Sequence, residues 1–330
     1  KSYKFPGGMA LALSDMRSFS LPRVNDLIEL RILIYGVLTV AVAAPAVLVA
    51  GWMTEFVKEV IVKATGGGID STPIAMDGFQ VSKTMWLKNG AFPRYDNPLV
   101  AIGANPFLIE VICRFTPDGI LEGVSSLPAR YCDTLDMEVT LGASTDVATP
   151  AGGGGTAVVS GLTILDANAV EEMNWGPQVE RWVKTEKRIL IEETLAAADI
   201  TKLADITGTG KLAAITIETE TAASVDSDAI LSDMVIKVQA KGGNQVDLDG
   251  AHFKSVQASN LAQYKVPQYL SSPPYTNVGF ARWEFDKTGM GDPDELVSVE
   301  SFESVEFHAK CILAGKLWLT VETWRKLRYA

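Results

Sequence analysis

The stretch Glu29–Ile34 (ELRILI) returns later in the chain as Glu186–Ile191 (EKRILI). Both copies place Arg-Ile-Leu-Ile at the start of an apolar run rich in β-branched residues, a composition typical of a buried strand. A match of four residues is weak by itself. It becomes informative if the segments that follow each copy also repeat in the same order.

Later segments do repeat in order, as three pairs of landmarks show: Asp77–Phe79 with Asp249–Phe253, an expected strand start at Phe107 with one at Phe280, and Leu141–Gly142 with Ala314–Gly315. The spacing between the copies changes twice along the chain. We interpret these changes as insertions in two surface loops, Ala196–Asp228 and Ala143–Gly155. The sequence therefore predicts one β-rich unit that occurs twice.

The composition agrees with two folded β domains. The chain has 330 residues, of which 47% are hydrophobic and 21% charged, so it can bury two cores and is not disordered. Its 28 glycines and 15 prolines lie between short runs of Val, Ile and Thr. This pattern favours an all-β chain with many turns over a helical one.

The boundary between the two units is expected at Asn174–Gln178, which contains Trp-Gly-Pro. We expect an N-terminal arm at 1–26, a first unit at 27–176 and a second at 177–330. Residues 77–89 fit either a strand or a short helix. Strands are expected at 27–42, 46–52, 55–64, 107–115, 131–141, 156–165, 182–195, 211–220, 230–240, 278–286, 296–313 and 316–324.

The run Ile32–Thr54 contains no charged residue and is long enough to span a bilayer. A transmembrane helix is therefore an alternative interpretation. Its density of Val, Ile and Thr favours strands, and Pro45 would break a helix in its middle. The flanks also lack the Lys/Arg imbalance that orients a membrane span. We predict two buried strands joined near Pro45.

The charge distribution limits the range of partners. The net charge of −11 argues against a nucleic-acid-binding body, which needs clustered Lys and Arg. The first residues differ, since Lys1, Lys4, Arg17 and Arg23 face only Asp15. This segment could meet lipid headgroups or nucleic acid, or it could be a terminus with incidental charge.

The three cysteines, Cys113, Cys132 and Cys311, are odd in number and form no Cys-x-x-Cys pair. Each lies in an apolar run, where Cys behaves as a small hydrophobic residue. We expect free thiols and folding in a reducing compartment such as the cytoplasm. No signal-peptide pattern opens the sequence, so no secretion is expected.

No stretch of the sequence predicts a nucleotide or metal site. Gly208–Lys211 lacks the Ser or Thr of a phosphate-binding loop, and Gly152–Gly155 precedes a strand, so both are predicted to be turns. The two histidines, His252 and His308, are too isolated for a metal site or a catalytic triad. We therefore expect no cofactor.

Several carboxylates are candidates for a Ca²⁺ site or for acid–base catalysis. The pairs Asp226/Asp228, Asp247/Asp249 and Asp292/Asp294 could bind Ca²⁺, but none continues into an EF-hand loop, and turn formation explains them. Glu284 and Glu322 could be a glycosidase pair or strand carboxylates facing solvent, and both interpretations stay open. We expect no catalytic residue, and no enzyme.

A tandem β unit joined by Trp-Gly-Pro resembles the double jelly-roll major capsid proteins of tailless icosahedral viruses, many with an internal membrane, including the adenovirus-hexon lineage and bacteriophages. Short motifs carry the likeness over nearly the whole chain: Leu21–Arg23 before Leu27–Val40, Leu127–Arg130 before Tyr131–Gly142, then Gly279–Phe285, Val305–Ala314 and Gly315–Leu319. The resemblance implies two eight-stranded jelly rolls in tandem, with short helices in the connections.

The resemblance also implies a structural role without cofactors. Such a chain would form homotrimeric, pseudo-hexagonal capsomers, which contact neighbouring capsomers and penton or minor capsid proteins in the virion shell. We expect Ala143–Gly155 and Ala196–Asp228 on the outer surface and the basic arm on the inside, against membrane or neighbouring capsomers. No sequence-specific nucleic-acid binding is implied.

Two other functions remain as alternatives. A β-sandwich of this composition could be a carbohydrate-binding or adhesin module, with Trp283, Trp318 and Trp324 as stacking platforms. It could also be a glycan-active enzyme on the same scaffold. These tryptophans fit equally well as core or interface residues.

Overall fold

The computed structural model describes residues 2–4, 9–41, 46–49, 52–66, 72–78, 80–81, 95–96, 98–116, 126–151, 155–172, 181–194, 196–223, 226–263, 278–286 and 292–327. The chain divides into two compact units. Unit 1 comprises Lys1–Thr116, Ser126–Val179 and Pro267–Tyr275, and unit 2 comprises Pro117–Ser125, Glu180–Val266 and Thr276–Ala330. Each unit is described by itself.

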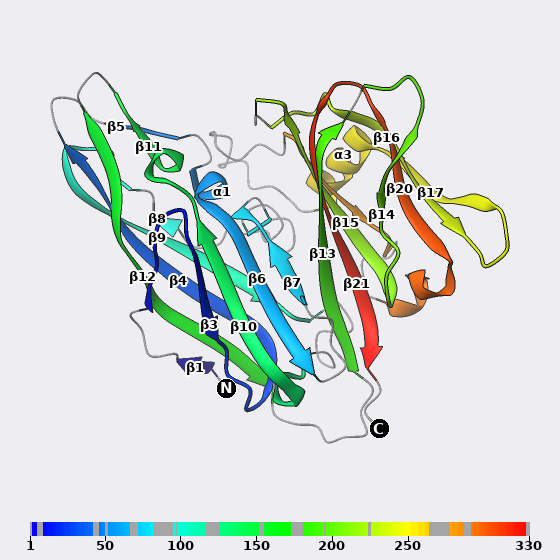
Figure 1. Ribbon diagram of the computed structural model, residues 1–330, viewed down its shortest axis with the longest axis horizontal. Helices are drawn as coiled ribbons and strands as arrows, with labels where there is room; N and C mark the ends of the chain where they lie inside the picture. The colour runs from blue at the N-terminus through cyan, green and yellow to red at the C-terminus, as the bar shows by residue number, and fades with distance from the viewer. Residues whose placement is uncertain are drawn as a thin grey trace. The chain divides into compact units, whose positions relative to one another are not determined.

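Unit 1 contains two main antiparallel sheets (Figure 1). The first has the order β1-β12-β4-β9-β8 with β2 also on β12, and the second has the order β3-β10-β6-β7. Their bounds are β1 Ser2–Lys4, β2 Met9–Ala10, β3 Met16–Ser20, β4 Asp26–Ala41, β6 Val57–Gly66, β7 Ile74–Met76, β8 Tyr95–Asp96, β9 Gly103–Arg114, β10 Cys132–Leu141 and β12 Thr156–Glu172. A small third sheet pairs β5 (Ala46–Leu48) with β11 (Ala148–Pro150). The helices are α1 (Trp52–Phe56) and the 3-10 turns Ala129–Tyr131 and Ser144–Asp146.

Unit 2 also consists of two antiparallel sheets. One has the order β13-β21-β15-β18 with β19 also on β15, and the other has the order β14-β20-β16-β17. Their bounds are β13 Arg181–Thr194, β14 Thr201–Asp205, β15 Lys211–Thr221, β16 Leu231–Gln239, β17 Gln245–His252, β18 Phe280–Glu284, β19 Val297–Ser298, β20 Ser304–Cys311 and β21 Gly315–Leu327. The helices are α3 (Phe253–Gln263) and the 3-10 turns Pro293–Glu295 and Val299–Ser301.

The two units share one topology. Within the described residues, eight strand positions recur in chain order: β1/β2, β3, β4, β6, β7, β9, β10 and β12 in unit 1, and β13, β14, β15, β16, β17, β18, β20 and β21 in unit 2. In both, positions 1-8-3-6 form one sheet and positions 2-7-4-5 form the other. Two such sheets, in which every connection except that between the fourth and fifth strands crosses from one sheet to the other, make a jelly roll. The prediction of two tandem jelly rolls is confirmed.

The first pair of the predicted repeat was wrong, whereas the Phe107/Phe280 and Leu141/Ala314 pairs lie at equivalent strands. Glu29–Ile34 lies in β4, a third strand, whereas Glu186–Ile191 lies in β13, a first strand. The segment Ala196–Asp228 is therefore no insertion, because it contains β14 and β15, the second and third strands of unit 2. Most side chains of β15 are buried, and several of them belong to the core of unit 2.

Residues 1–26, expected as an arm, contain the first two strands of unit 1. β1 and β2 pair with β12, and β3 pairs with β10 from Met16 to Ser20. Both arginines of this segment have partners within unit 1. Arg17 forms an ion pair with Asp15 at 3.1 Å, and Arg23 donates to the carbonyl oxygens of Cys132 and Asp133.

The uncharged run after Arg31 begins with a buried strand, as predicted, but its second strand is short and exposes Val47. It continues β4 to Ala41 and includes β5, and no helix in the described part of the chain is long and apolar enough to cross a membrane. The expected strand at 55–64 begins later, because Trp52–Phe56 is the helix α1. Its Trp52 packs edge-on against Phe107, with ring centroids 5.3 Å apart. Gly36 leaves room for that ring, since a Cβ there would lie 2.4 Å from Phe107 Cζ.

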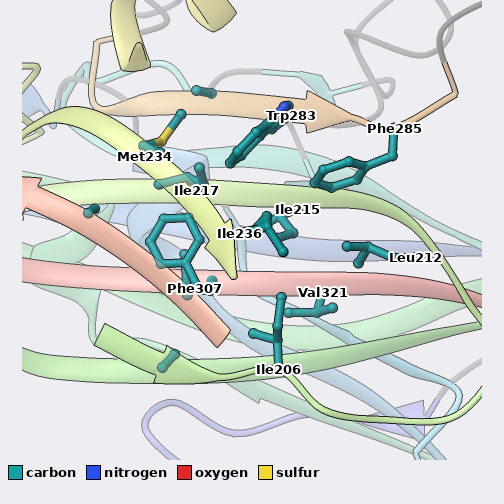
Figure 2. Close-up of a cluster of buried hydrophobic side chains, with 14 of the residues drawn as sticks. Ile206, Leu212, Ile215, Ile217, Met234, Ile236, Trp283, Phe285, Phe307 and Val321 are labelled. Atoms are coloured by element: carbon teal, nitrogen blue, oxygen red, sulfur yellow. The ribbon is translucent and has the colours of Figure 1, made fainter. Parts of the chain in front are cut away.

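The core of unit 2 lies between its two sheets. Alternate residues of each strand point inward, among them Ile215 and Ile217 of β15, Ile236 of β16 and Phe307 of β20 (Figure 2). Trp283 and Phe285 fill the same core with ring centroids 5.1 Å apart. The other face of each strand is then free to carry polar groups.

Candidate functional site: outer sheet faces and strand ends

The residues considered for metal or acid–base chemistry do not converge. His252 is exposed on β17, whereas His308 is buried on β20 and its Nε2 lies 2.8 Å from Glu306 Oε2. Across the described ranges, no three His, Cys, Asp or Glu side chains are grouped as metal ligands. The isolated placement of the two histidines agrees with the sequence.

The three aspartate pairs serve turns and surface ion pairs. Asp228 Oδ1 accepts hydrogen bonds from the Gly279 N–H at 2.7 Å and from Gln257 at 2.8 Å. Asp292 accepts from the Asp294 N–H at 2.9 Å at the start of a 3-10 turn. Asp247 lies 3.6 Å from Lys237. The contact of Asp292 matches the predicted turn role, whereas Asp247 and Asp249 lie within β17, so the turn prediction was wrong for that pair.

The glycine turns and the cysteines also match their predictions where the structure describes them. Gly210 has a φ of +89° and leads directly into β15, so no helix N-terminus follows it. Residues 152–154 of the other glycine cluster lie outside the described residues. All three cysteines are free and buried, and burial raises the pKa of the Cys132 thiol to about 11.

The structure brings Glu284 and Glu322 together, through one arginine. Arg282 of β18 donates to Glu284 Oε1 at 3.0 Å and to Glu322 Oε2 at 2.8 Å, and it also reaches Thr216 of β15 at 3.2 Å. Trp324 donates to the other oxygen of Glu322 at 2.9 Å. The Arg282 and Glu322 side chains are only 6% and 2% exposed. A carboxylate bound in this way supports the sheet and is not available as a general acid.

This ion network belongs to two adjacent rows on the outer face of the β13-β21-β15-β18 sheet. Glu186, Glu322, Ala214 and Glu284 oppose one another in one row, and Arg188, Thr320, Thr216 and Arg282 in the next. Opposed residues on neighbouring strands lie close enough to interact. An acidic row therefore lies beside a row with arginine at each end. Lys184 adds a further bond to Glu186 at 2.8 Å.

Unit 1 has a similar group on the corresponding sheet. Glu29 of β4 binds Arg31 through one oxygen and Arg114 of β9 through the other, the latter at 3.1 Å. Arg31 also lies 4.0 Å from Glu110. Here the arginine side chains are 50% and 27% exposed. The first residues of the Glu29–Ile34 stretch are thus an outer-face ion group of the third strand.

The β14-β20-β16-β17 sheet of unit 2 carries a separate polar group on its outer face. Glu306 accepts hydrogen bonds from Lys202 at 2.5 Å and Gln245 at 2.7 Å, and His308 lies 2.8 Å away. The hydrogen bond from Lys202, followed by that from His308, lowers the pKa of Glu306 to about 2. This carboxylate is therefore ionised at any physiological pH.

Each unit exposes aliphatic side chains at one end. We call this the crossover end, where the chain passes from the seventh strand in one sheet to the eighth in the other, at Gly142–Gly155 and Ile312–Ala314. The exposed side chains are Val47, Leu99 and Ile102 in unit 1 and Ile200, Ile312 and Leu313 in unit 2. Backbone bonds hold the segments of each group together, from Ala46 to Val100 and from Ala197 to Cys311. Exposed aliphatic groups of this kind favour contacts with other proteins.

The tryptophans do not form a binding platform. Trp283 and Trp324 are buried in the core of unit 2, and Trp318 is half-buried on β21. Of the two roles that the sequence left open for these residues, stacking platforms or core and interface aromatics, the burial of Trp283 and Trp324 favours the second.

Comparisons with solved structures agree with the topology. The major capsid protein of Sulfolobus turreted icosahedral virus matches with a TM-score of 0.74 and 13% identity, over 99% of this chain and 97% of that one. The Faustovirus major capsid protein matches with a TM-score of 0.62 and 8% identity, over 100% and 90%. The major capsid protein of bacteriophage PM2 matches with a TM-score of 0.57 and 12% identity, over 99% and 97%.

No protein-family model matches the chain, and no curated protein matches its sequence. At identities this low, the structural likeness establishes the fold. It extends over almost the full length of both chains in each comparison, so it covers both jelly rolls and their order. The chain has the double jelly-roll fold that is found in these viral major capsid proteins.

Proposed function

We propose that the chain is a structural major capsid protein, which trimerises into pseudo-hexagonal capsomers and assembles an icosahedral virion shell. The observation that supports this most is the recurrence of one strand order, 1-8-3-6 and 2-7-4-5, in both halves of the chain. Three copies of a chain with two similar jelly rolls supply six similar bodies. A threefold assembly of this kind can tile a surface as a hexagon.

The described residues give no competing chemistry. Glu284 and Glu322 are held by Arg282, Asp292 serves a turn, Asp247 pairs with Lys237, and the tryptophans of unit 2 pack inward or lie half-buried. What the molecule does offer is a set of rigid sheets with exposed aliphatic groups at both crossover ends. Such surfaces suit neighbouring capsomers and penton or minor capsid proteins as partners.

The proposal also assigns an inside and an outside. In unit 1 the segment 143–151 lies at the crossover end, whereas β1 pairs with Asn168–Val170 near the opposite end of β12. We place the crossover end outward and the N-terminal residues toward an internal membrane. Limited proteolysis of intact particles tests this arrangement. Cleavage within 143–151 with Lys4 protected is expected, and the reverse pattern contradicts it.

Light scattering after size-exclusion chromatography, followed by electron microscopy, tests the function as a whole. The purified chain is expected to elute at three times its 35.5 kDa mass and to form hexagonal tiles or closed shells at high concentration. A monomer that binds a glycan column and forms no particles would overturn the assignment. A trimer that binds glycan and forms no tiles would support trimerisation but contradict assembly into a shell.

A further inference from the structure

Among the described residues of unit 2, one end strand has backbone groups that face away from the rest of its sheet. β18 is the end strand in the order β13-β21-β15-β18. Its neighbours Gly279 and Phe285 bond toward β15, with Thr219 N–H donating to Gly279 at 2.7 Å and Phe285 N–H donating to Ala213 at 2.9 Å. Backbone groups alternate along a strand, so those of Phe280 and Arg282 point away from β15.

Two amide side chains of α3 reach these outward backbone groups. Asn260 Oδ1 accepts from the Arg282 N–H at 2.9 Å, and Asn260 Nδ2 donates to the Arg282 carbonyl at 2.8 Å. Gln257 Nε2 donates to the Phe280 carbonyl at 3.0 Å. Asn260 and Gln257 are only 5% and 6% exposed. Both therefore spend their polar atoms on β18 and its surroundings.

The Asn260 side chain makes the same pair of bonds that a neighbouring strand would make. One donor and one acceptor on a single residue are the unit of an antiparallel ladder. An end strand without such a partner is a template for a strand from another chain. We propose that α3 is an edge cap, whose amides occupy β18 and keep a second copy of this chain from adding a strand there.

The cap is also tied to the ion network. Arg282 has its backbone held by Asn260 and its guanidinium held by Glu322 and Glu284. At the start of the strand, Asp228 accepts from both Gln257 and the Gly279 N–H. The position of α3, the end of β18 and the buried ion pairs are thus fixed by one connected set of bonds. Removing the Asn260 amide takes two hydrogen bonds from the backbone of Arg282, whose side chain stays in the ion network.

The test is the double variant Gln257→Ala with Asn260→Ala in the full chain, with Ser259→Ala on the exposed face of α3 as control. Hydrogen exchange of the Arg282 amide is expected to be at least tenfold faster in dilute double variant and unchanged in the control. As concentration rises, the double variant is expected to associate beyond the wild-type oligomer. The Arg282 amide should then become protected again, because an added strand covers it.

Two results would overturn the proposal. One is an unchanged oligomeric state with wild-type exchange at Arg282, and the other is association in which the Arg282 amide stays fast. The native fold of each variant is checked first by alkylation, to which the buried Cys311 thiol should remain unreactive. If the double variant does not fold, the single variant Asn260→Ser is judged by the same two readouts. None of these outcomes depends on whether the chain forms a shell.

Discussion

The outer faces of the corresponding sheets in units 1 and 2 both carry Arg–Glu groups, but they differ in burial. In unit 1, Arg31 and Arg114 hold Glu29 while remaining partly in solvent. In unit 2, Arg282 and Glu322 are almost fully buried. An exposed pair gains little because water and salt screen it, whereas a buried pair cannot lose one member without leaving an unpaired charge. Loss of Arg31 is therefore expected to be tolerated, because the buried Glu29 keeps Arg114 as a partner, whereas loss of Arg282 leaves Glu322 without its cation.

The largest effect is expected from Arg282→Met, which leaves the buried Glu322 without its cation. We expect unit 2 to lose about 3–5 kcal/mol of unfolding free energy. Urea unfolding followed by tryptophan fluorescence measures this, since Trp283 and Trp324 are in the unit 2 core. The matched variant in unit 1 is Arg31→Met, with an expected loss of about 0–1 kcal/mol. Equal losses in the two variants would contradict the comparison.

A second variant acts on unit 1 alone. Gly36→Ala places a Cβ 2.4 Å from Phe107 Cζ and 2.9 Å from Leu162 Cδ2, so the ring must move. We expect unit 1 to lose about 1–3 kcal/mol, with unit 2 unchanged. Combining it with Phe107→Leu should recover part of the loss, because the smaller side chain makes room. A Gly36→Ala protein as stable as wild type would show that the aromatic contact at α1 is not tight.

A smaller effect is expected for Glu306→Gln, and it depends on pH. The pKa of Glu306 is lowered in the folded state to about 2, so its contribution is present above the ordinary carboxyl pKa. It is lost as the pH falls toward 2. We expect the wild type to exceed the variant by roughly 1 kcal/mol at pH 7 and to match it near pH 2. Urea midpoints measured across this range test the sign, and a difference that grows on acidification would refute it.

The smallest effect is a difference in thiol reactivity that reports on each unit separately. Cys113 and Cys132 lie in unit 1 and Cys311 in unit 2, all buried. Burial raises the pKa of Cys132 to about 11 and also raises the pKa of Cys311, so neither forms much thiolate in the native protein at pH 8. Pulsed alkylation in rising urea should label Cys311 earlier in Arg282→Met, with the unit 1 thiols unaffected. Labelling of all three together would show that the units unfold as one.

Composition and alternation were sufficient to predict the fold class and most long strands. β4, β9, β10, β15 and β21 begin and end close to their expected bounds, because each is a run of β-branched and apolar residues between turns. β1 to β3 were not found, since Met16–Ser20 has no alternating apolar pattern and β1 and β2 are very short. Pairing with β10 and β12, which local sequence does not encode, makes them strands.

The mismatch of the first repeat pair and the helix α3 could not be foreseen from the sequence, for two physical reasons. Arg-Ile-Leu-Ile matched in β4 and β13 because both are buried strands, and strand propensity does not reveal the position of a strand in a sheet. The buried side of α3 carries Phe253, Val256, Gln257 and Asn260, so half of it is amide. The segment therefore lacks the apolar residues at three- and four-residue spacing that would predict a helix from the sequence. An Asn and a Gln three residues apart become informative only once β18 is known to lie beside them.

The position of the eighth strand has a consequence for synthesis on the ribosome. In each unit this strand lies between the first and the third, so the first strand has no partner in its sheet, and the third strand pairs only with the sixth, until β12 or β21 has emerged. Contacts between residues so far apart in sequence form slowly. Unit 1 can complete both sheets while unit 2 is still being made, whereas β13 and β15 wait with open edges for β21. The period before the eighth strand arrives is when the nascent chain most needs protection from its neighbours.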